Sequence, residues 1–298
     1  MISRIGDAAQ TQAMTRDILG AQSRVRESQS QISSGKSASR YDQIADRASY
    51  LVRAKEHEAL IGEYAKGNRE VVDRINAMEG AVQTIADSAE RFRSLLVQRV
   101  DATAGAQVPM ESEIENLLLQ LEHQLNAKFD NRALFAGSRT DIDPVQIPDP
   151  PPTVADPALY YQGDELTPRH RADTGIDVIY GIEASDPAFA GLISALGVAL
   201  EAHQANDRTG LETALAKATQ SIDDIANIRG TLGARSERLQ SIATSQDAQM
   251  DYLRQTISEI EDVDLATAMA KLAEDRNMLE ASYLAVSQIN SLSLADYL

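Results

Sequence analysis

The placement of proline restricts the fold of this chain more than any other feature. All nine prolines of the 298 residues lie between Pro109 and Pro187, so residues 1–108 and 188–298 contain none. Because proline interrupts helix interiors, two long proline-free arms predict helical ends around an inserted, non-helical segment. We expect that segment to begin near Gly137 and to end near Pro187.

Apolar residues in both arms recur at alternating steps of four and three, the spacing of a buried helix seam. The longest series comprises Val71, Ile75, Met78, Val82, Ile85, Ala89, Phe92 and Leu96. It predicts a helix over residues 64–104, which at ~1.5 Å per residue would be roughly 60 Å long. Such sustained spacing favours helices that supercoil about one another. The predicted fold class is mainly α: a long coiled-coil-like helical bundle formed by both chain ends, with a small β-rich domain inserted in the middle.

Two shorter series predict helix seams near the chain ends. The N-terminal one is Met14, Ile18, Ala21, Val25 and Ile32. The C-terminal one is Leu265, Met269, Leu272, Arg276, Leu279, Tyr283 and Val286, with Leu292 and Leu294 beyond it. A seam is core by default, but short seams also suit contacts between subunits. Arg276 is polar in an apolar row, so it either sets the register of the helices or contacts a carboxylate of a neighbouring subunit. The alternative is a side chain that extends into solvent.

Strand composition occurs only in the middle, at residues 159–161 and 176–180. In the arms, three sites predict interruptions of the helices. Gly35 suits the C-cap of the first helix, and residues 230–233, Gly-Thr-Leu-Gly, suit a flexible joint or turn. The acidic residues 259–264 suit a solvated break with an N-cap.

The charge balance is strongly acidic. The chain has 28 Lys+Arg and 45 Asp+Glu, a formal charge of −17, which argues against nucleic acid as a partner. Residues 1–100 carry 15 basic and 13 acidic groups, residues 101–200 carry 5 and 16, and residues 201–298 carry 8 and 16. We therefore expect a solvated, acidic middle segment and mildly complementary charges on the two arms.

Recognisable catalytic or metal-binding patterns are missing from the sequence. There is no cysteine, and His57-Glu58 is followed by Ile61 where a zinc-protease motif needs its second histidine. Residues 30–37 end like a phosphate-binding loop, but Ser30 replaces the leading glycine. The sequence also has no apolar run long enough to cross a membrane, and no apolar signal segment follows Met1. We expect no enzyme, no cofactor, no metal site and no membrane span.

Several short segments resemble the bacterial flagellin superfamily. They are Gln31–Lys36, Asn68–Gln98, Asp262–Ala266, Leu279–Tyr283 and Leu292–Leu298. Within that superfamily, Leu134–Asp141 and Tyr161–Asp164 are similar to segments of hook–filament junction proteins, as is the ending Leu294–Leu298. Residues 41–45 depart from the usual pattern.

The resemblance implies a structural subunit at the junction between hook and filament, exported without a cleaved signal peptide and located in the extracellular flagellum. Its implied partners are copies of itself in a ring, the other hook-associated junction protein, flagellin and an export chaperone. It implies three parts. Residues 1–40 with 265–298 would be an inner helical domain, disordered until assembly. Residues 41–137 with 188–264 would form a helical bundle, and residues 138–187 a β-rich outer domain. A filament flagellin is the alternative, and an intracellular coiled-coil adaptor a remote one.

Overall fold

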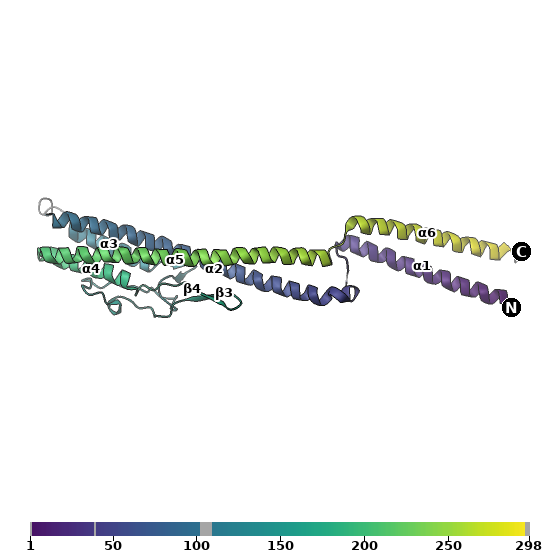
Figure 1. Cartoon of the computed structure of the whole chain (residues 1–298), viewed down its shortest axis with the longest axis horizontal. Coiled ribbons are helices and arrows are strands. Elements are labelled where there is room, and N and C mark those ends of the chain that lie inside the picture. Colours follow the sequence, from purple (N-terminus) through teal and green to yellow (C-terminus); the bar gives the residue numbers. More distant parts are fainter. Residues whose placement is uncertain (1, 39, 102–108, 296–298) are drawn as a thin grey trace. The chain divides into compact units, whose positions relative to one another are not determined.

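The computed structural model describes the backbone of residues 2–38, 40–101 and 109–295, and within these ranges the side chains from Gln12 to Gln288 except Gln43. Its helices are α1 (Ile2–Ser34), α2 (Ala45–Val100), α3 (Met110–Leu125), α4 (Pro187–Gln204), α5 (Arg208–Glu261) and α6 (Leu265–Ala295). The strands are β1 (Lys128–Phe129), β2 (Arg132–Ala133), β3 (Arg169–Asp173) and β4 (Ile176–Ile179). Long helices at both ends and a little sheet between them confirm the predicted fold class (Figure 1).

The chain divides into two compact units, one of residues 1–60 with 249–298 and one of residues 61–248. We call them the terminal unit and the central unit. These bounds differ from those of the three expected parts, so that three-part division stays a prediction. Among the described residues, no helix is both long and apolar enough to span a membrane.

The core of the central unit is built from the predicted stripe of α2 packed against α3, α4 and α5. Apart from Val71, which is half-buried, every residue of that stripe is buried. Helix α4 is apolar on almost every face, with Phe189, Ile193 and Leu196 all buried, and it lies inside this core. Each such large side chain contributes about 1.5–3 kcal/mol when it leaves water.

The prediction of a flexible joint or turn at residues 230–233 is wrong, because α5 continues through these residues without a break. Buried Ile225, Ile228 and Leu232 carry the apolar stripe directly across the glycines. Two helical glycines cost roughly 1 kcal/mol each relative to alanine, whereas each of those apolar side chains contributes about 1.5–3 kcal/mol on burial. Packing therefore overrides the local preference.

The middle segment holds less sheet than its composition suggests. Expected strand 176–180 is confirmed as β4, which pairs antiparallel with β3. The prediction of a strand at residues 159–161 is wrong. Pro157–Leu159 form a 3-10 helix, and of the predicted strand Tyr161 alone pairs, in an isolated bridge to Val145. The cause is local, since the Asp156 carboxylate accepts the Ala158 N–H at 3.0 Å and caps the turn.

Candidate functional site

The terminal unit pairs the two ends of the chain, with α1 lying alongside α6 (Figure 1). Of the residues predicted on α1, Ala21 is buried and Met14, Ile18, Val25 and Ile32 are half-buried. Ser28 is buried in the same row, so small side chains let the two helices approach. None of the larger residues is fully covered, because one partner helix shields only one side of each.

The residues predicted on α6 fall into two rows. Leu272, Leu279 and Val286 are half-buried, in the row that also holds buried Ala268 and Asp275. Leu265, Met269, Arg276 and Tyr283 are exposed in a neighbouring row, Met269 at 56%. Leu292 and Leu294 belong to α6, but their side chains lie outside those that the structure describes. Helix α6 thus has more apolar surface than α1 covers.

Asp275, not Arg276, is the charged residue between the two helices. Its side chain is only 8% exposed, and its Oδ1 accepts Arg24 Nε at 2.9 Å. Its Oδ2 is buried and has no hydrogen-bond partner among the described residues. Asp275 is not among the predicted seam residues, because the predicted series passes from Leu272 through Arg276 to Leu279. The spacing Ala268, Leu272, Asp275, Leu279 was the available signal.

Between the helix pair and the rest of the terminal unit, the two chain arms meet in a short backbone bridge, here named the crossing (residues 35–37 and 260–264). Lys36 and Asp262 pair as an isolated antiparallel bridge, and Ser37 N–H donates to Glu261 O at 2.6 Å. Gly35 has φ +69°, and its N–H donates to Gln31 O at 2.9 Å, which confirms the predicted C-cap. The Asp264 carboxylate accepts the Ala266 N–H at 2.9 Å, which confirms the predicted N-cap.

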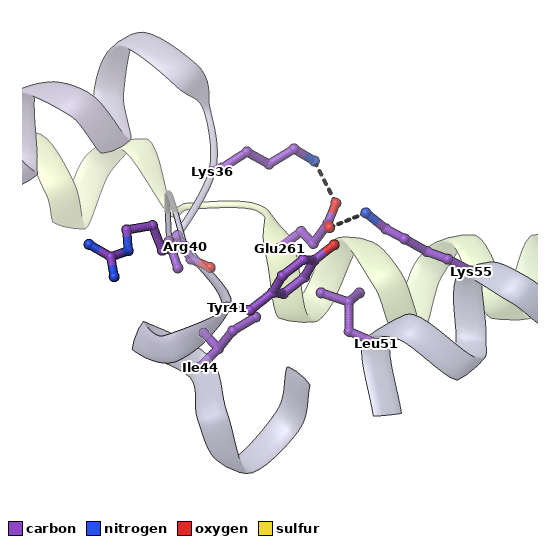
Figure 2. Close-up of a pocket in the computed structure, with 9 residues that line it drawn as sticks. Lys36, Arg40, Tyr41, Ile44, Leu51, Lys55 and Glu261 are labelled. Carbon is purple, nitrogen blue, oxygen red and sulfur yellow. Dashed lines mark hydrogen bonds and ion pairs between the residues drawn. The ribbon is translucent and has the colours of Figure 1, made fainter. Parts of the chain in front are cut away.

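At the crossing, lysines of the N-terminal arm form ion pairs with carboxylates of the C-terminal arm. Figure 2 shows Lys36 and Lys55 reaching Glu261 from two sides, and Lys36 Nζ also donates to Asp262 at 2.7 Å. Burial alone would raise the pKa of Glu261, but the hydrogen bonds from Lys55 and Lys36 lower it. The hydrogen bond to Asp262, followed by that to Glu261, raises the pKa of Lys36. Glu261 and Asp262 are therefore neutralised by lysines of the other arm, as suits a joint between chain ends better than a cation site.

A pocket of about 320 Å³ opens beside these ion pairs, with Tyr41, Ile44 and Leu51 as its apolar lining (Figure 2). Leu51 is fully buried, whereas Tyr41 is 54% exposed. Within the described part of the chain, no three His, Asp or Glu side chains gather as metal ligands would. The polar lining of the pocket includes the lysine-bound carboxylate of Glu261 and the hydroxyl of Ser37, which donates to Ile260 O at 2.8 Å.

In the central unit, two of the segments singled out by resemblance meet in space. We call this contact, between residues 137–139 and 161–164, the insertion latch. Ser138 N–H donates to Asp164 Oδ1 at 2.8 Å, and Arg139 donates to Gln162 O at 2.9 Å. The hydrogen bonds from Ser138, side chain first and then backbone, lower the pKa of Asp164.

Glycine is required in this latch. Gly137 has φ +69°, and a Cβ there would lie 2.2 Å from Asp164 Oδ1. Gly163 leaves equally little room, because a Cβ would lie 2.2 Å from the Tyr161 hydroxyl. That hydroxyl donates to Asp164 O at 2.7 Å, so the tyrosine and the two glycines hold the start and the middle of the inserted segment together.

Comparisons with known proteins match both arms. Residues 5–140 match the bacterial flagellin N-terminal helical region and residues 215–298 the bacterial flagellin C-terminal helical region, together about three quarters of the chain. The flagellin of Bacillus subtilis (strain 168) is 23% identical over 233 residues, 76% of either chain.

Solved structures share the fold. A candidate flagellar hook-associated protein from Vibrio parahaemolyticus aligns with TM-score 0.62 at 12% identity, covering 74% of this chain and 100% of that one. Bacillus cereus FlgL aligns with TM-score 0.53 at 20% identity, covering 64% and 98%. With family matches at both ends and a shared fold, the chain belongs to the bacterial flagellin superfamily and is a structural subunit of the flagellum.

Proposed function

We propose that the chain forms the junction between hook and filament and seeds filament growth. The observation that carries this proposal is the insertion latch. Its two segments, within Leu134–Asp141 and Tyr161–Asp164, are similar to those of hook–filament junction proteins and lie in mutual contact. A fold shared with FlgL and with a candidate hook-associated protein supports the same assignment.

In the proposed function, the chain acts by assembling with other subunits and catalyses no reaction. Leu265, Met269 and Tyr283 form an exposed row on α6 that a neighbouring copy would cover in a ring. Because α1 and α6 bury little on their own, the helix pair would order fully only on assembly. The chain would pass unfolded through the flagellar export apparatus with a chaperone, without a cleaved signal peptide. It would then contact the other hook-associated junction protein on one side and flagellin on the other.

Limited proteolysis of the purified monomer tests the proposed order-on-assembly. We expect trypsin to cleave within residues 1–35 and within α6 well before it cleaves the buried stretch of α2. Arg16, Arg26 and Lys271 supply sites in these helices. Equal resistance of the two helices and the central unit would contradict the proposal, because it would show a helix pair that is stable alone.

A filament flagellin is the second candidate, favoured by the named relative, which is itself a flagellin. Deleting the gene distinguishes the two. Loss of a junction protein should leave intact hooks and release flagellin into the medium, and restoring the gene should rebuild filaments. Loss of one flagellin among several should leave filaments attached. Attached filaments in the deletion strain would refute the junction role.

A further inference from the structure

The hairpin of β3 and β4 in the central unit has one covered edge. On β3, the Ala172 carbonyl accepts Asn68 Nδ2 at 3.0 Å and Gln246 Nε2 at 2.8 Å. These amides come from α2 and α5 and are buried, so they block β3 from pairing with any further strand. A strand edge protected in this manner cannot act as a template for association.

The β4 edge is open. Tyr180 N–H donates to Pro168 O at 3.1 Å, and the alternation of an antiparallel ladder then turns the backbone groups of Asp177 and Ile179 away from β3. In the part of the chain that the structure describes, no other segment hydrogen-bonds to those groups. The side chain of Ile179 is 42% exposed, and β4 has no proline or lysine of the kind that discourages strand pairing.

A groove lies between this open edge and α5, here named the β4 groove and defined by residues 177–179 and 226–238. On α5, the residues at successive turns are Ala226, Gly230 and Ala234, all exposed and all small. A Cβ placed on Gly230 would meet no atom within 4 Å. The glycine is therefore not needed for packing inside this chain, and its absence of a side chain keeps the groove wide.

Two arginines line the groove against one carboxylate, that of Asp177, which is itself paired with Arg171 at 3.3 Å, so the groove is positive on balance. Arg235 donates to Gly181 O at 3.0 Å, which fixes it along one wall. Arg238 is exposed and makes no hydrogen bond or ion pair with any described residue. The chain around them is acidic, since residues 101–200 carry 16 acidic and 5 basic groups. Copies of one chain thus offer both the cationic groove and an anionic segment to fill it, the requirement for head-to-tail association.

We propose that the β4 groove binds an extended acidic segment of a second copy of this chain. The segment adds a strand to β4 through the free backbone groups of Asp177 and Ile179, lays apolar side chains over the small residues of α5, and places a carboxylate on Arg238. This inference rests on the proposed function, because it names one surface through which subunits would meet.

Hydrogen exchange of the full-length chain, measured residue by residue in a concentration series from about 10 μM to about 1 mM, tests the proposal. We expect the Ile179 amide to exchange at least ~10-fold more slowly at the high concentration. Gly230→Gln should abolish that change by filling the groove. Gly80→Gln is the matched control, because Gly80 is also an exposed glycine within a helix, and a Cβ there would meet no atom within 4 Å.

Arg238→Glu should weaken the effect as well, and added salt should weaken it in the unmodified chain. Exchange at Ile179 that does not vary with concentration overturns the inference, as does equal behaviour of the Gly230 and Gly80 variants. The two proposals fail separately. If the Ile179 amide of the unmodified chain stays unprotected at high concentration while Gly230→Gln still rebuilds filaments in the deletion strain, the groove is excluded and the junction role stands. If the unmodified chain shows the protection but cannot rebuild filaments, the junction role falls alone.

Discussion

Removing the buried amide of Asn68 should destabilise the central unit by about 3 kcal/mol. Asn68 is fully buried and makes three hydrogen bonds, to Ala172 O at 3.0 Å, to Gln246 Oε1 at 2.8 Å and with His170 Nε2 at 2.9 Å. Because its Nδ2 already donates twice, its Oδ1 must accept, so His170 carries a proton on Nε2. Burial lowers the pKa of His170, which keeps that ring neutral at pH 7.

The magnitude follows from what Asn68→Ala leaves behind. Three hydrogen bonds at about 1 kcal/mol each are lost. Ala172 O keeps its bond from Gln246 Nε2, but Gln246 Oε1 loses its donor while only 1% of that residue is exposed. A buried acceptor without a partner costs about 1–3 kcal/mol. Since Ala172 O keeps a donor and water can replace the bond of half-buried His170, only the bond to Gln246 is lost without replacement. About 1 kcal/mol for that bond and about 1–3 kcal/mol for the unpaired acceptor give a total near 3 kcal/mol.

Urea unfolding followed by circular dichroism gives the comparison, with Asn76→Ala as the control. Asn76 lies on the same helix but is exposed, and among the described residues its side chain has one hydrogen bond, a long one of 3.5 Å that its Oδ1 accepts from Ser236 Oγ. We expect the control to cost less than ~0.5 kcal/mol. The double variant Asn68→Ala/Gln246→Ala should cost at least ~1 kcal/mol less than the two single changes added together, because both break the same bond. Equal costs for Asn68 and Asn76, or strict additivity with Gln246, would refute the reasoning.

Three further outcomes are expected. Gly233→Ala should stabilise the chain by about 0.5–1 kcal/mol in the same urea assay, because the added Cβ would meet no atom within 4 Å. Gly137→Ala should destabilise the chain, because Gly137 has φ +69° and the added Cβ would clash with Asp164. Burial, and then Arg99, lower the pKa of His203 in the folded chain. As the pH falls below about 6.5, the unfolded chain therefore binds a proton at His203 before the folded chain does, and the free energy of unfolding should decrease. His203→Gln should make the free energy of unfolding depend less on pH in this range. Arg276→Leu should leave monomer stability unchanged and impair assembly in the deletion strain; normal assembly would exclude a subunit contact at Arg276.

The sequence predicts the buried stripe of α2 well, because one face of that helix is buried along its whole length. The predicted bounds of 64–104 are wrong, since α2 begins at Ala45 and ends at Val100. The stripe from Ile75 to Leu96 is periodic, and periodicity reports burial directly. The prediction fails where local preference and tertiary packing disagree. Residues 230–233 are a joint by composition, but buried Leu232 keeps them helical.

The functional surfaces are harder to predict, for a different reason. Asp275 is polar, so a search for apolar rows passes over it, although it lies in the row that faces α1. The insertion latch joins Gly137 to Asp164, and nothing local to either residue identifies the other. Only resemblance to known proteins marked both segments in advance. Contacts between distant segments leave no periodic signal in a single sequence.

The charge pattern connects the sequence to assembly more directly. Basic groups of the near-neutral N-terminal arm bind carboxylates of the acidic C-terminal arm, at Arg24 with Asp275 and at Lys36 and Lys55 with Glu261. Because the lysine or arginine of each pair is 41–47% exposed, each pair contributes only about 0–1 kcal/mol, which is too little to hold two helices together. They can still decide which alignment of the arms is preferred, because a shift along the helix would leave the largely buried Asp275 without a cation. We therefore expect the ion pairs to set the register of the chain ends, and the apolar surface buried between α1 and α6 to keep those ends together. The row on α6 that α1 leaves uncovered would add to that energy only in the proposed assembly, where a neighbouring copy covers it.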